Sequence, residues 1–523
     1  MRDGNGWTSA GLLSRRGFLG TAAAGALVTA GGLWLPRAAH AQEAKKGGTL
    51  RLGMEGGTST DSFNPMTLSD EVPISLCYAV MNGLIEFDGA GQPQPELIES
   101  WEVAPGAKVW TFNIRQGVTF SNGKTLDAQD VIYSINLHRG ETVSQLKGNL
   151  EPITDIKKIT DTQIEITLSQ GNADFVALLG DYHLLVVPDG HTDWANPIGT
   201  GAYVVESFEP GVRAVFKNRG DYWKPGRGNF DTVEIRYIAD AVARTSALQS
   251  GQIDGANRLD PRTVDFLMQA PNLHIVRGEG TGLRYVFCAR VSDDPYTNKN
   301  AVLALKYGID RQKIIDNVLN GYATIGNDHT VAPSNPFFNA DLPQRAYDPD
   351  KAAFHLKEAG LTGSEFRLTV SEGAWVTSPD CAQIFQQSLE PAGIKLELNK
   401  VPADGYWSNV WRVDPFCAVI WGARMTADES LTVSYSTASP MNDSNWKNET
   451  FDKLLAEARV ELDQAKRKEM YATCQQLVSD EAGHIVFAIN DTLDGYATTV
   501  MGVDKHPRFG MCDLRVAEKA WFA

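Results

Sequence analysis

The sequence predicts an α/β protein of two or three domains. Short apolar or alternating runs that suit strands take turns with longer helical patterns, most regularly in the second half of the chain. The 482 residues that follow residue 41 are too many for one hydrophobic core. No segment among them approaches the ~18 uninterrupted apolar residues of a membrane span, so we expect them to form a soluble protein.

Residues 1–41 have the layout of an export signal. The pair Arg15-Arg16 precedes a modestly apolar run, and Ala39-His40-Ala41 offers small residues at the two positions that a signal peptidase reads. This pattern resembles a twin-arginine signal with cleavage after Ala41. A membrane anchor is the alternative, but Gly and Thr dilute the run and Pro36-Arg37 stops it. We therefore expect a periplasmic protein.

The chain is acidic. It carries 48 basic and 64 acidic residues, a net charge of −16. Cleavage of a signal with four arginines and one aspartate would bring this charge to −19. Such a surface argues against nucleic acid and anionic lipid as partners.

The cysteines show no metal-ligand or redox spacing. None of the six forms a CxxC pair, and we expect no metal site and no cofactor. Twin-arginine substrates are expected to cross the membrane folded, from a reducing cytosol, so buried thiols are the leading interpretation. A Cys288–Cys417 disulfide is the alternative. The six are Cys77, Cys288, Cys381, Cys417, Cys474 and Cys512.

The first half of the chain predicts more strands than helices. Asp127 and Asp130 form a capping pattern at the start of one helix. The glycines of 278–282 lack the third position of a nucleotide-binding loop, which favours a connection. The predicted strands are 50–52, 110–114, 163–168, 203–208, 212–217 and 232–238, with 203–208 paired to 212–217. The predicted helices are 74–84, 127–135 and 241–250.

The second half alternates helices and strands. Asp310 caps one helix, and Asp348-Pro349 opens another. The predicted helices are 300–308, 310–320, 348–360, 380–389, 449–462 and 463–480. The predicted strands are 366–370, 394–398, 417–421 and 485–489.

The stretch from Cys417 to Asp428 is the first candidate for a binding site. Its apolar strand breaks at Gly422, so that Trp421 stands at the strand end and Arg424 and Asp428 follow in a loop. Strand ends of α/β sheets are where such proteins hold ligands. A core tryptophan beside a solvated arginine is the alternative, and spacing does not separate the two.

Catalytic motifs are missing from the sequence. The nine histidines form no HxxxH, and neither a GxSxG elbow nor a P-loop occurs. Asp293-Asp294 precedes a proline in a polar loop and is typical of a solvated turn. An enzyme is therefore disfavoured.

Seven segments, spread in order over the chain after the signal, resemble a known family. The chain is similar to family 5 bacterial extracellular solute-binding proteins, the dipeptide, oligopeptide and nickel receptors of ABC importers. The segments are Gly48-Thr49-Leu50, residues 82–86, residues 100–115, residues 121–131, Gly199-Thr200-Gly201-Ala202-Tyr203, residues 218–223 and residues 304–311.

The resemblance implies a type II periplasmic-binding-protein fold, with two lobes joined by a hinge and an extra inserted domain. Ligand would lie between the two lobes. The implied domain I comprises 48–88, 186–280 and 491–523, the inserted domain II comprises 89–185, and domain III comprises 281–490.

The resemblance also implies ligand-binding residues. In peptide-binding members an aspartate shortly after a strand tryptophan binds the peptide α-ammonium, and Arg424 stands at that position here. A guanidinium repels an ammonium, so we hypothesise a ligand that offers a carboxylate to Arg424. The alternative is an Arg424 that points to solvent or pairs with Asp428. The other implied lining residues are Trp421, Tyr285, Arg284, Asp328, His329 and Glu55.

The function implied is capture of a peptide or peptide-like solute for an ABC permease at the inner membrane, by a monomer and without catalysis. Two alternatives remain open. One is a ligand sensor for a receptor kinase. The other is a binding protein for a non-peptide solute such as an opine, an oligosaccharide or a metal chelate.

Overall fold

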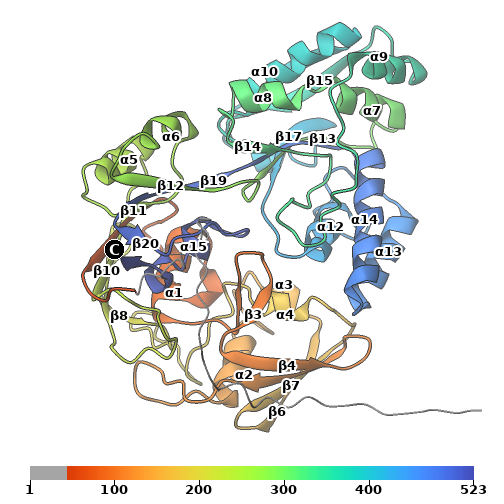
Figure 1. Cartoon of the computed structure of the whole chain (residues 1–523). Coiled ribbons are helices and arrows are strands. Elements are labelled where there is room, and N and C mark those ends of the chain that lie inside the picture. Colours follow the sequence, from red (N-terminus) through yellow and green to blue (C-terminus); the bar gives the residue numbers. More distant parts are fainter. Residues whose placement is uncertain (1–43) are drawn as a thin grey trace, which may run out of the picture. The chain divides into compact units, whose positions relative to one another are not determined.

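Three principal β-sheets organise the chain (Figure 1). The structure is a computed structural model that describes residues 44–523. The predicted export signal at residues 1–41 lies outside the described residues.

The first sheet has seven strands and draws them from both ends of the chain. Its central strand β1 (Thr49–Met54) runs parallel to β10 and β11, and the remaining pairs are antiparallel. The predicted pairing of 203–208 with 212–217 is confirmed as β8 with β9. The order is β12 (Leu273–Gly278), β19 (Thr492–Ala497), β11 (Gly255–Ala256), β1, β10 (Thr232–Tyr237), β9 (Arg213–Asn218) and β8 (Tyr203–Glu209).

Helices α1 (Glu71–Val80), α5 (Ala241–Gln249) and α6 (Pro261–Leu267) accompany this sheet. The prediction of a helix over 74–84 was wrong at its end, because α1 stops at Val80. There the backbone of Gly199 and Gly201 approaches so closely that a Cβ on Gly199 would lie 2.1 Å from the Val80 carbonyl oxygen. The chain continues past Val80 in an extended conformation, and the glycines make room for this close approach.

The second sheet is an antiparallel four-stranded unit. Its order is β4 (Ile98–Val103), β5 (Val109–Ile114), β7 (Gln163–Leu168) and β6 (Ile153–Thr160). Helix α2 (Ala128–Asn136) begins at the predicted capping box, in which the Asp127 side chain accepts from the Asp130 amide and Asp130 reciprocates. Two short helices, α3 (Lys147–Leu150) and α4 (Phe175–Leu178), complete this part.

The third sheet has six strands, mixed in direction. Strand β13 pairs antiparallel with β17 and β18, and β15 pairs parallel with β16 and β17. The predicted caps Asp310 and Asp348 are confirmed at α8 and α9. The order is β14 (Ala323–Ile325), β18 (His484–Asn490), β13 (Arg284–Ala289), β17 (Phe416–Trp421), β15 (Glu365–Val370) and β16 (Lys395–Lys400).

Helices pack around this third sheet, with α13 and α14 side by side in Figure 1. They are α7 (Lys299–Gly308), α8 (Arg311–Asn317), α9 (Pro349–Glu358), α10 (Ser378–Leu389), α11 (Tyr406–Asn409), α12 (Ala427–Tyr435), α13 (Glu449–Val460) and α14 (Gln464–Glu481). The smaller elements elsewhere are β2 (Ile85–Phe87), β3 (Pro93–Pro95), β20 (Val500–Met501), β21 (Trp521–Phe522), α15 (Gly510–Asp513) and α16 (Val516–Lys519).

The chain crosses between the seven- and six-stranded sheets twice, from β12 to β13 and back from β18 to β19. The predicted glycine-rich connection at 278–282 is the first crossing, and Asp491 alone separates β18 from β19. The Asp491 carboxylate ties the crossings together, accepting from Arg277 Nε at 2.6 Å and from the Gly280 amide at 2.8 Å. Paired crossings of this kind suit a hinge.

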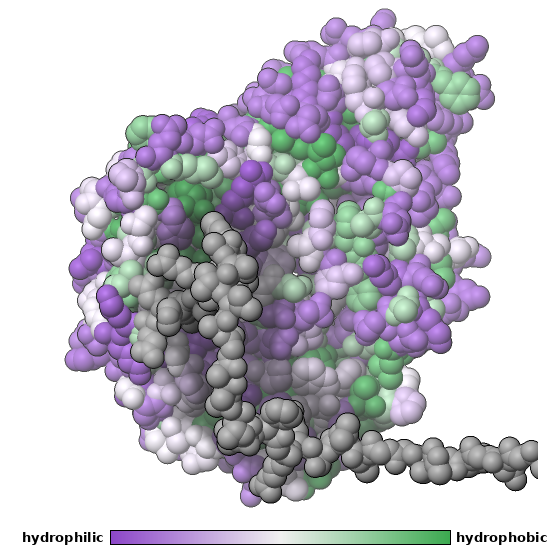
Figure 2. Space-filling view, in the orientation of Figure 1, coloured by the Kyte–Doolittle hydropathy of each residue, from purple (hydrophilic) through white to green (hydrophobic). Residues whose placement is uncertain are grey.

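Each sheet lies within one of the three predicted domain ranges, 48–88 with 186–280 and 491–523, 89–185, and 281–490. The division into domains itself stays a prediction. Across residues 44–523 we find no helix with the length and apolarity needed to cross a bilayer. The face in Figure 2 is mostly hydrophilic, with apolar residues scattered in small groups.

Candidate functional site

A cavity of about 1430 Å³ is lined by residues from all three sheet regions. The six-stranded region contributes Tyr285, Arg424 and Asp428. The seven-stranded region contributes Glu55, Glu71, Arg258 and Asp494, and the four-stranded region contributes Asp174 and Leu178. A volume this large exceeds the ~300–1,000 Å³ of ordinary small-molecule pockets, which suits a peptide-sized solute with bound water.

Arg424 lines this cavity, as predicted, but it has a partner of its own. Strand β17 ends at Trp421, and α12 begins after Thr426, whose hydroxyl accepts from the Glu429 amide at 3.1 Å. Arg424 therefore lies in a five-residue connection, 422–426, beside the first turn of α12. Its Nε is 3.4 Å from Glu429 Oε1, with the two side chains 36% and 38% exposed. The alternative in which Arg424 pairs with Asp428 was wrong, because the carboxylate that pairs with Arg424 is that of Glu429.

Asp428 pairs with Arg459, whose Nε lies 3.0 Å from its Oδ2. Burial raises the pKa of Asp428, and the Arg459 guanidinium opposes that rise. Arg459 also donates to the Thr432 hydroxyl at 2.7 Å, so it is held from two sides. Asp428 and Arg459 both line the cavity as a neutralised pair.

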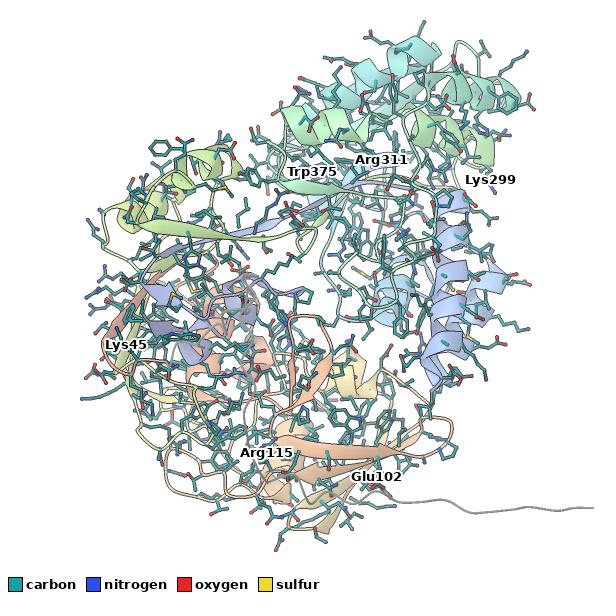
Figure 3. The ribbon with its side chains drawn as sticks, in the orientation of Figure 1. Lys45, Glu102, Arg115, Lys299, Arg311 and Trp375 are labelled. Atoms are coloured by element: carbon teal, nitrogen blue, oxygen red, sulfur yellow. The ribbon has the colours of Figure 1, made fainter. Side chains whose placement is uncertain are left out.

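Tyr285 and Trp421 lie on neighbouring strands but face opposite ways. Trp421 is directly opposite Arg284 in the β13–β17 register, and side chains alternate along a strand. Tyr285 lines the cavity and stacks on Trp375, labelled in Figure 3, with ring centroids 4.9 Å apart. Trp421 instead packs in the buried core of the six-stranded region, 6.4 Å from the His484 ring. Trp421 is thus not among the residues that line this cavity, and its contact with a ligand stays a prediction.

Arg284 is a buried cation beside the cavity. Its guanidinium is 3% exposed and donates to two carbonyl oxygens, of Thr330 at 2.9 Å and Gly282 at 2.7 Å. Burial, with a smaller repulsion from Arg424, lowers the pKa of Arg284 to about 10. Its neighbours Gly282 and Tyr285 line the cavity, whereas Arg284 itself is buried behind them and does not line it.

Asp328 is held away from the cavity by two arginines. Its carboxylate is fully buried, 2.7 Å from Arg311 Nη2 and 2.9 Å from Arg345 Nε. The positive charges of Arg311, Lys306 and Arg345 together outweigh desolvation and lower the pKa of Asp328. Figure 3 labels Arg311 in this region. Asp328 is thus a buried anion that is not among the residues lining the cavity, and its contact with a ligand stays a prediction.

His329 is also buried, with its ring 5.7 Å from that of Phe338. Within residues 44–523 neither ring nitrogen has a hydrogen-bond partner, and burial lowers the pKa of His329 to about 4. A neutral imidazole in the core accounts for this position. His329 is not among the residues that line the cavity, and its contact with a ligand likewise stays a prediction.

Glu55 lines the cavity, as predicted, in a cluster that sequence reasoning missed. It lies 3.0 Å from Arg244 Nη2 and 3.8 Å from Arg258 Nη1. Arg258 also bonds to Asp70 at 2.6 Å and to Glu71 at 3.1 Å. These residues come from separate segments, so no local sequence signal links them.

Asp494 is a second missed residue of the wall. It is buried, lines the cavity and accepts from the Met511 amide at 2.6 Å. Desolvation raises the pKa of Asp494 to about 7. The turn that it caps is left-handed over Met511 to Leu514, four non-glycine residues with positive φ. Such strain is typically found near functional sites and needs firm anchoring.

Three residues whose side chains could ligate a metal, Cys288, Asp443 and His484, come together outside the cavity. The cysteine spacing in the sequence had predicted no metal site. Asp443 Oδ1 lies 2.7 Å from His484 Nε2, which is 4.0 Å from Cys288 Sγ. Trp411 donates to the other Asp443 oxygen at 3.0 Å. Metal-bound histidines hold their second ring N–H on an acceptor, but His484 Nδ1 has no partner among the described residues. The approach of His484 to the Asp443 carboxylate, with no acceptor for Nδ1, favours a structural role over a metal site.

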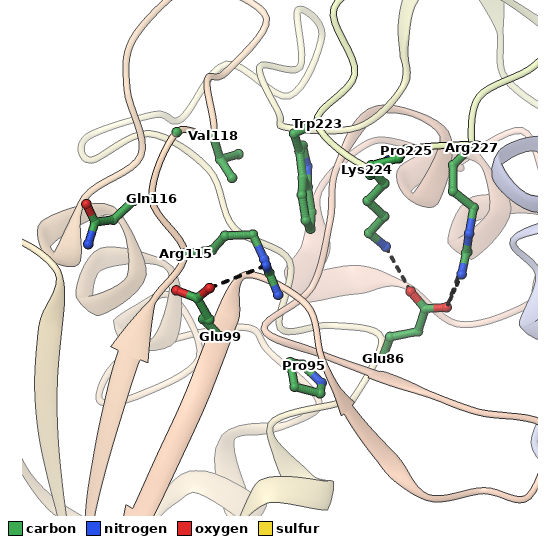
Figure 4. Close-up of a pocket in the computed structure, with 11 residues that line it drawn as sticks. Glu86, Pro95, Glu99, Arg115, Gln116, Val118, Trp223, Lys224, Pro225 and Arg227 are labelled. Atoms are coloured by element: carbon green, nitrogen blue, oxygen red, sulfur yellow. Dashed lines mark hydrogen bonds and ion pairs between the residues drawn. The ribbon is translucent and has the colours of Figure 1, made fainter. Parts of the chain in front are cut away.

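A smaller cavity of about 670 Å³ lies apart from the first, and its charged groups are already paired (Figure 4). Glu86 bonds to Lys224 at 2.8 Å and to Arg227 at 3.3 Å, and Arg115 lies 3.8 Å from Glu99. The two Glu86 pairs link β2 to Lys224 and Arg227, the Arg115–Glu99 pair lies within the four-stranded unit, and both favour a structural role.

Comparisons with known proteins agree with this architecture. The model of the family "Bacterial extracellular solute-binding proteins, family 5 Middle" matches residues 92–465. Di/tripeptide-binding protein 1 of Pseudomonas aeruginosa (strain UCBPP-PA14) is 26% identical over 440 residues, covering 77% of this chain and 82% of that protein.

Solved structures share the fold. The periplasmic binding protein DppA from Helicobacter pylori, in complex with the peptide STSA, has a TM-score of 0.73 at 22% identity, covering 91% of this chain and 98% of that chain. AgaA from A. tumefacien R10, in complex with agropinic acid, has the same TM-score and identity, covering 91% and 99%.

These likenesses identify the fold as the type II periplasmic-binding-protein fold with an inserted four-stranded part. The family model spans well over half of the chain, from residue 92 to the start of α14. The chain belongs to family 5 of the bacterial extracellular solute-binding proteins.

Proposed function

We propose that this protein captures a peptide or peptide-like solute in the 1430 Å³ cavity and delivers it to an ABC permease at the inner membrane. The observation that carries the proposal is a large cavity lined by residues of all three sheet regions, in a chain that crosses between the seven- and six-stranded sheets through two short connections. Lobes connected in this way close over a solute and reopen to release it. The relatives are binding proteins, which supports capture without catalysis.

The charges near Arg424 support a ligand with a carboxylate. Arg284 and Arg424 lie close enough that Arg424 contributes to the lowered pKa of Arg284, and Glu429 is the one carboxylate paired with Arg424. Among residues 44–523, Arg424 and Glu429 are each other's only ion-pair partners, and both side chains are more than a third exposed. A ligand carboxylate could replace Glu429 on Arg424, in the same cavity that Tyr285 lines with its aromatic ring.

Calorimetry with matched dipeptides tests this assignment, after native mass spectrometry has shown which solute co-purifies. A dipeptide with a free C-terminus is expected to bind, and its C-terminal amide is expected to bind at least tenfold more weakly. An N-acetylated dipeptide should keep most of its affinity. Equal binding of the amide would overturn the carboxylate assignment, and failure of every peptide would favour a non-peptide solute.

The export route is part of the proposal. We infer that the protein reaches the periplasm through its twin-arginine signal, is cleaved after Ala41 and acts as a monomer without nucleic acid. N-terminal sequencing of the periplasmic protein should begin at Gln42. Replacement of Arg15 and Arg16 by lysine should leave the protein uncleaved in the cytoplasm.

A further inference from the structure

The four-stranded region touches the six-stranded region through the loop 171–174, between β7 and α4. The Ala173 amide donates to the Arg459 carbonyl oxygen at 2.7 Å, and Asp174 Oδ2 lies 2.6 Å from Arg467 Nη2. Gly171 makes the approach sterically feasible, since a Cβ there would lie 1.9 Å from the Gly106 carbonyl oxygen and 3.1 Å from Val460 Cγ1.

The first of these contacts satisfies a helix end. Arg459 belongs to the last turn of α13, where backbone carbonyls have no partner within the helix. The Ala173 amide supplies the donor for one of them, and Arg467 Nε supplies another to the Ala458 carbonyl at 3.1 Å. The loop therefore supplies a hydrogen-bond donor to the C-terminal end of α13.

The second contact joins a buried cation to a carboxylate from the other region. Arg467 is 2% exposed, and its guanidinium lies 4.8 Å from the Phe337 ring centroid and 5.4 Å from that of Tyr471. Its Nη2 also donates to the Tyr471 hydroxyl at 3.2 Å. Asp174 is the carboxylate that pairs with it, and a buried guanidinium that loses such a partner is strongly destabilised.

Both sides of the contact also line the ligand cavity. Asn172 and Asp174 do so from the loop, and Asp428 and Arg459 do so from the six-stranded region. Separation of the walls at this end of the cavity would break the Ala173 hydrogen bond and the Asp174 ion pair together.

We propose that the loop 171–174 is a latch that closes one end of the ligand cavity, with Asp174 on Arg467 as its fastening. The inserted four-stranded part thereby acts as a third wall that controls opening and limits how far a ligand extends past Asp428. This inference rests on the proposed function, because that function makes the cavity a ligand site, but its test needs no ligand.

The test compares Asp174→Asn with Asp161→Asn as a matched control. Asp161 lies in the same four-stranded region and pairs with Lys158 at 2.7 Å, but it is 84% exposed. Spin labels at Val143→Cys and Phe354→Cys, both exposed positions, report the distance between the two regions. Asp174→Asn should enlarge the long-distance population relative to the unsubstituted protein, whereas Asp161→Asn should leave the distribution unchanged.

Hydrogen exchange of the peptide containing Ala173 gives a second readout. Its amide should exchange at least tenfold faster in Asp174→Asn, and Asp174→Glu, which keeps the carboxylate, should recover most of the protection. Unchanged distances and unchanged exchange in Asp174→Asn would overturn the latch. If Asp174→Asn does not fold, Ala173→Pro, which removes the amide that donates to Arg459 and leaves Arg467 paired, provides the same comparison of distances. A protein that binds no peptide yet shows these changes would refute the proposed function alone.

Discussion

The substitution Asp328→Asn separates a structural role from a ligand-binding one. The carboxylate is fully buried and makes charge-assisted bonds of 2.7 Å to Arg311 and 2.9 Å to Arg345. It also raises the pKa of the buried Lys306, which burial brings down to about 7. Asparagine keeps the size of the side chain but leaves these cations without their common anion.

Removal of one partner from a buried ion pair costs about 3–5 kcal/mol, since an uncompensated charge remains. We expect a loss of that size in the unfolding free energy of the six-stranded region. Denaturant unfolding followed by tryptophan fluorescence would measure it, with Asp161→Asn as a surface control that should change stability by less than about 0.5 kcal/mol. Solute affinity of the folded variant should stay unchanged. A stability loss below about 1 kcal/mol, or a selective loss of affinity, would refute this reasoning.

Further predictions concern the cavity, pH and the thiols. Arg424→Gln should weaken a carboxylate ligand by about 1–3 kcal/mol in calorimetry, whereas Glu429→Gln, which frees Arg424, should strengthen it; equal affinities would contradict the charge assignment. His329 has a folded pKa of about 4, against about 6.5 unfolded, so it costs stability as pH falls from 6.5 to 4. Between pH 7 and pH 4, the free energy of unfolding of His329→Leu should therefore fall by about 3 kcal/mol less than that of the unsubstituted protein. An unchanged pH dependence would count against a neutral buried ring. All six cysteines are buried thiols and should resist a thiol reagent until denaturation, when six should react without reductant. Four would instead indicate the Cys288–Cys417 disulfide.

Local signals accounted for much of the fold. Capping at Asp127, Asp310 and Asp348 placed three helix starts, because these side chains satisfy backbone amides within their own turn. Gly422 marked the end of a strand correctly. Such interactions span few residues and are therefore legible in sequence.

The orientation of the side chains of the same strand, β17, could not be predicted from local signals. Sequence spacing did not say which face of β17 meets the cavity, and the pairing of Trp421 with Arg284 turned the tryptophan into the core. A one-residue difference in position reverses the face of a strand. Tyr285 of β13, whose side chain is on the other face, is the aromatic residue that lines the cavity here.

The sequence by itself determined the family, the order of elements and the presence of Arg424 after a strand end. Only the tertiary structure decided which charges are free to meet a ligand. Arg345 and Arg311 converge on Asp328, Glu429 reaches Arg424, and Asp174 crosses to Arg467. Ion pairing depends on distances of a few ångströms between segments far apart in the chain, and no local pattern of residues encodes those distances.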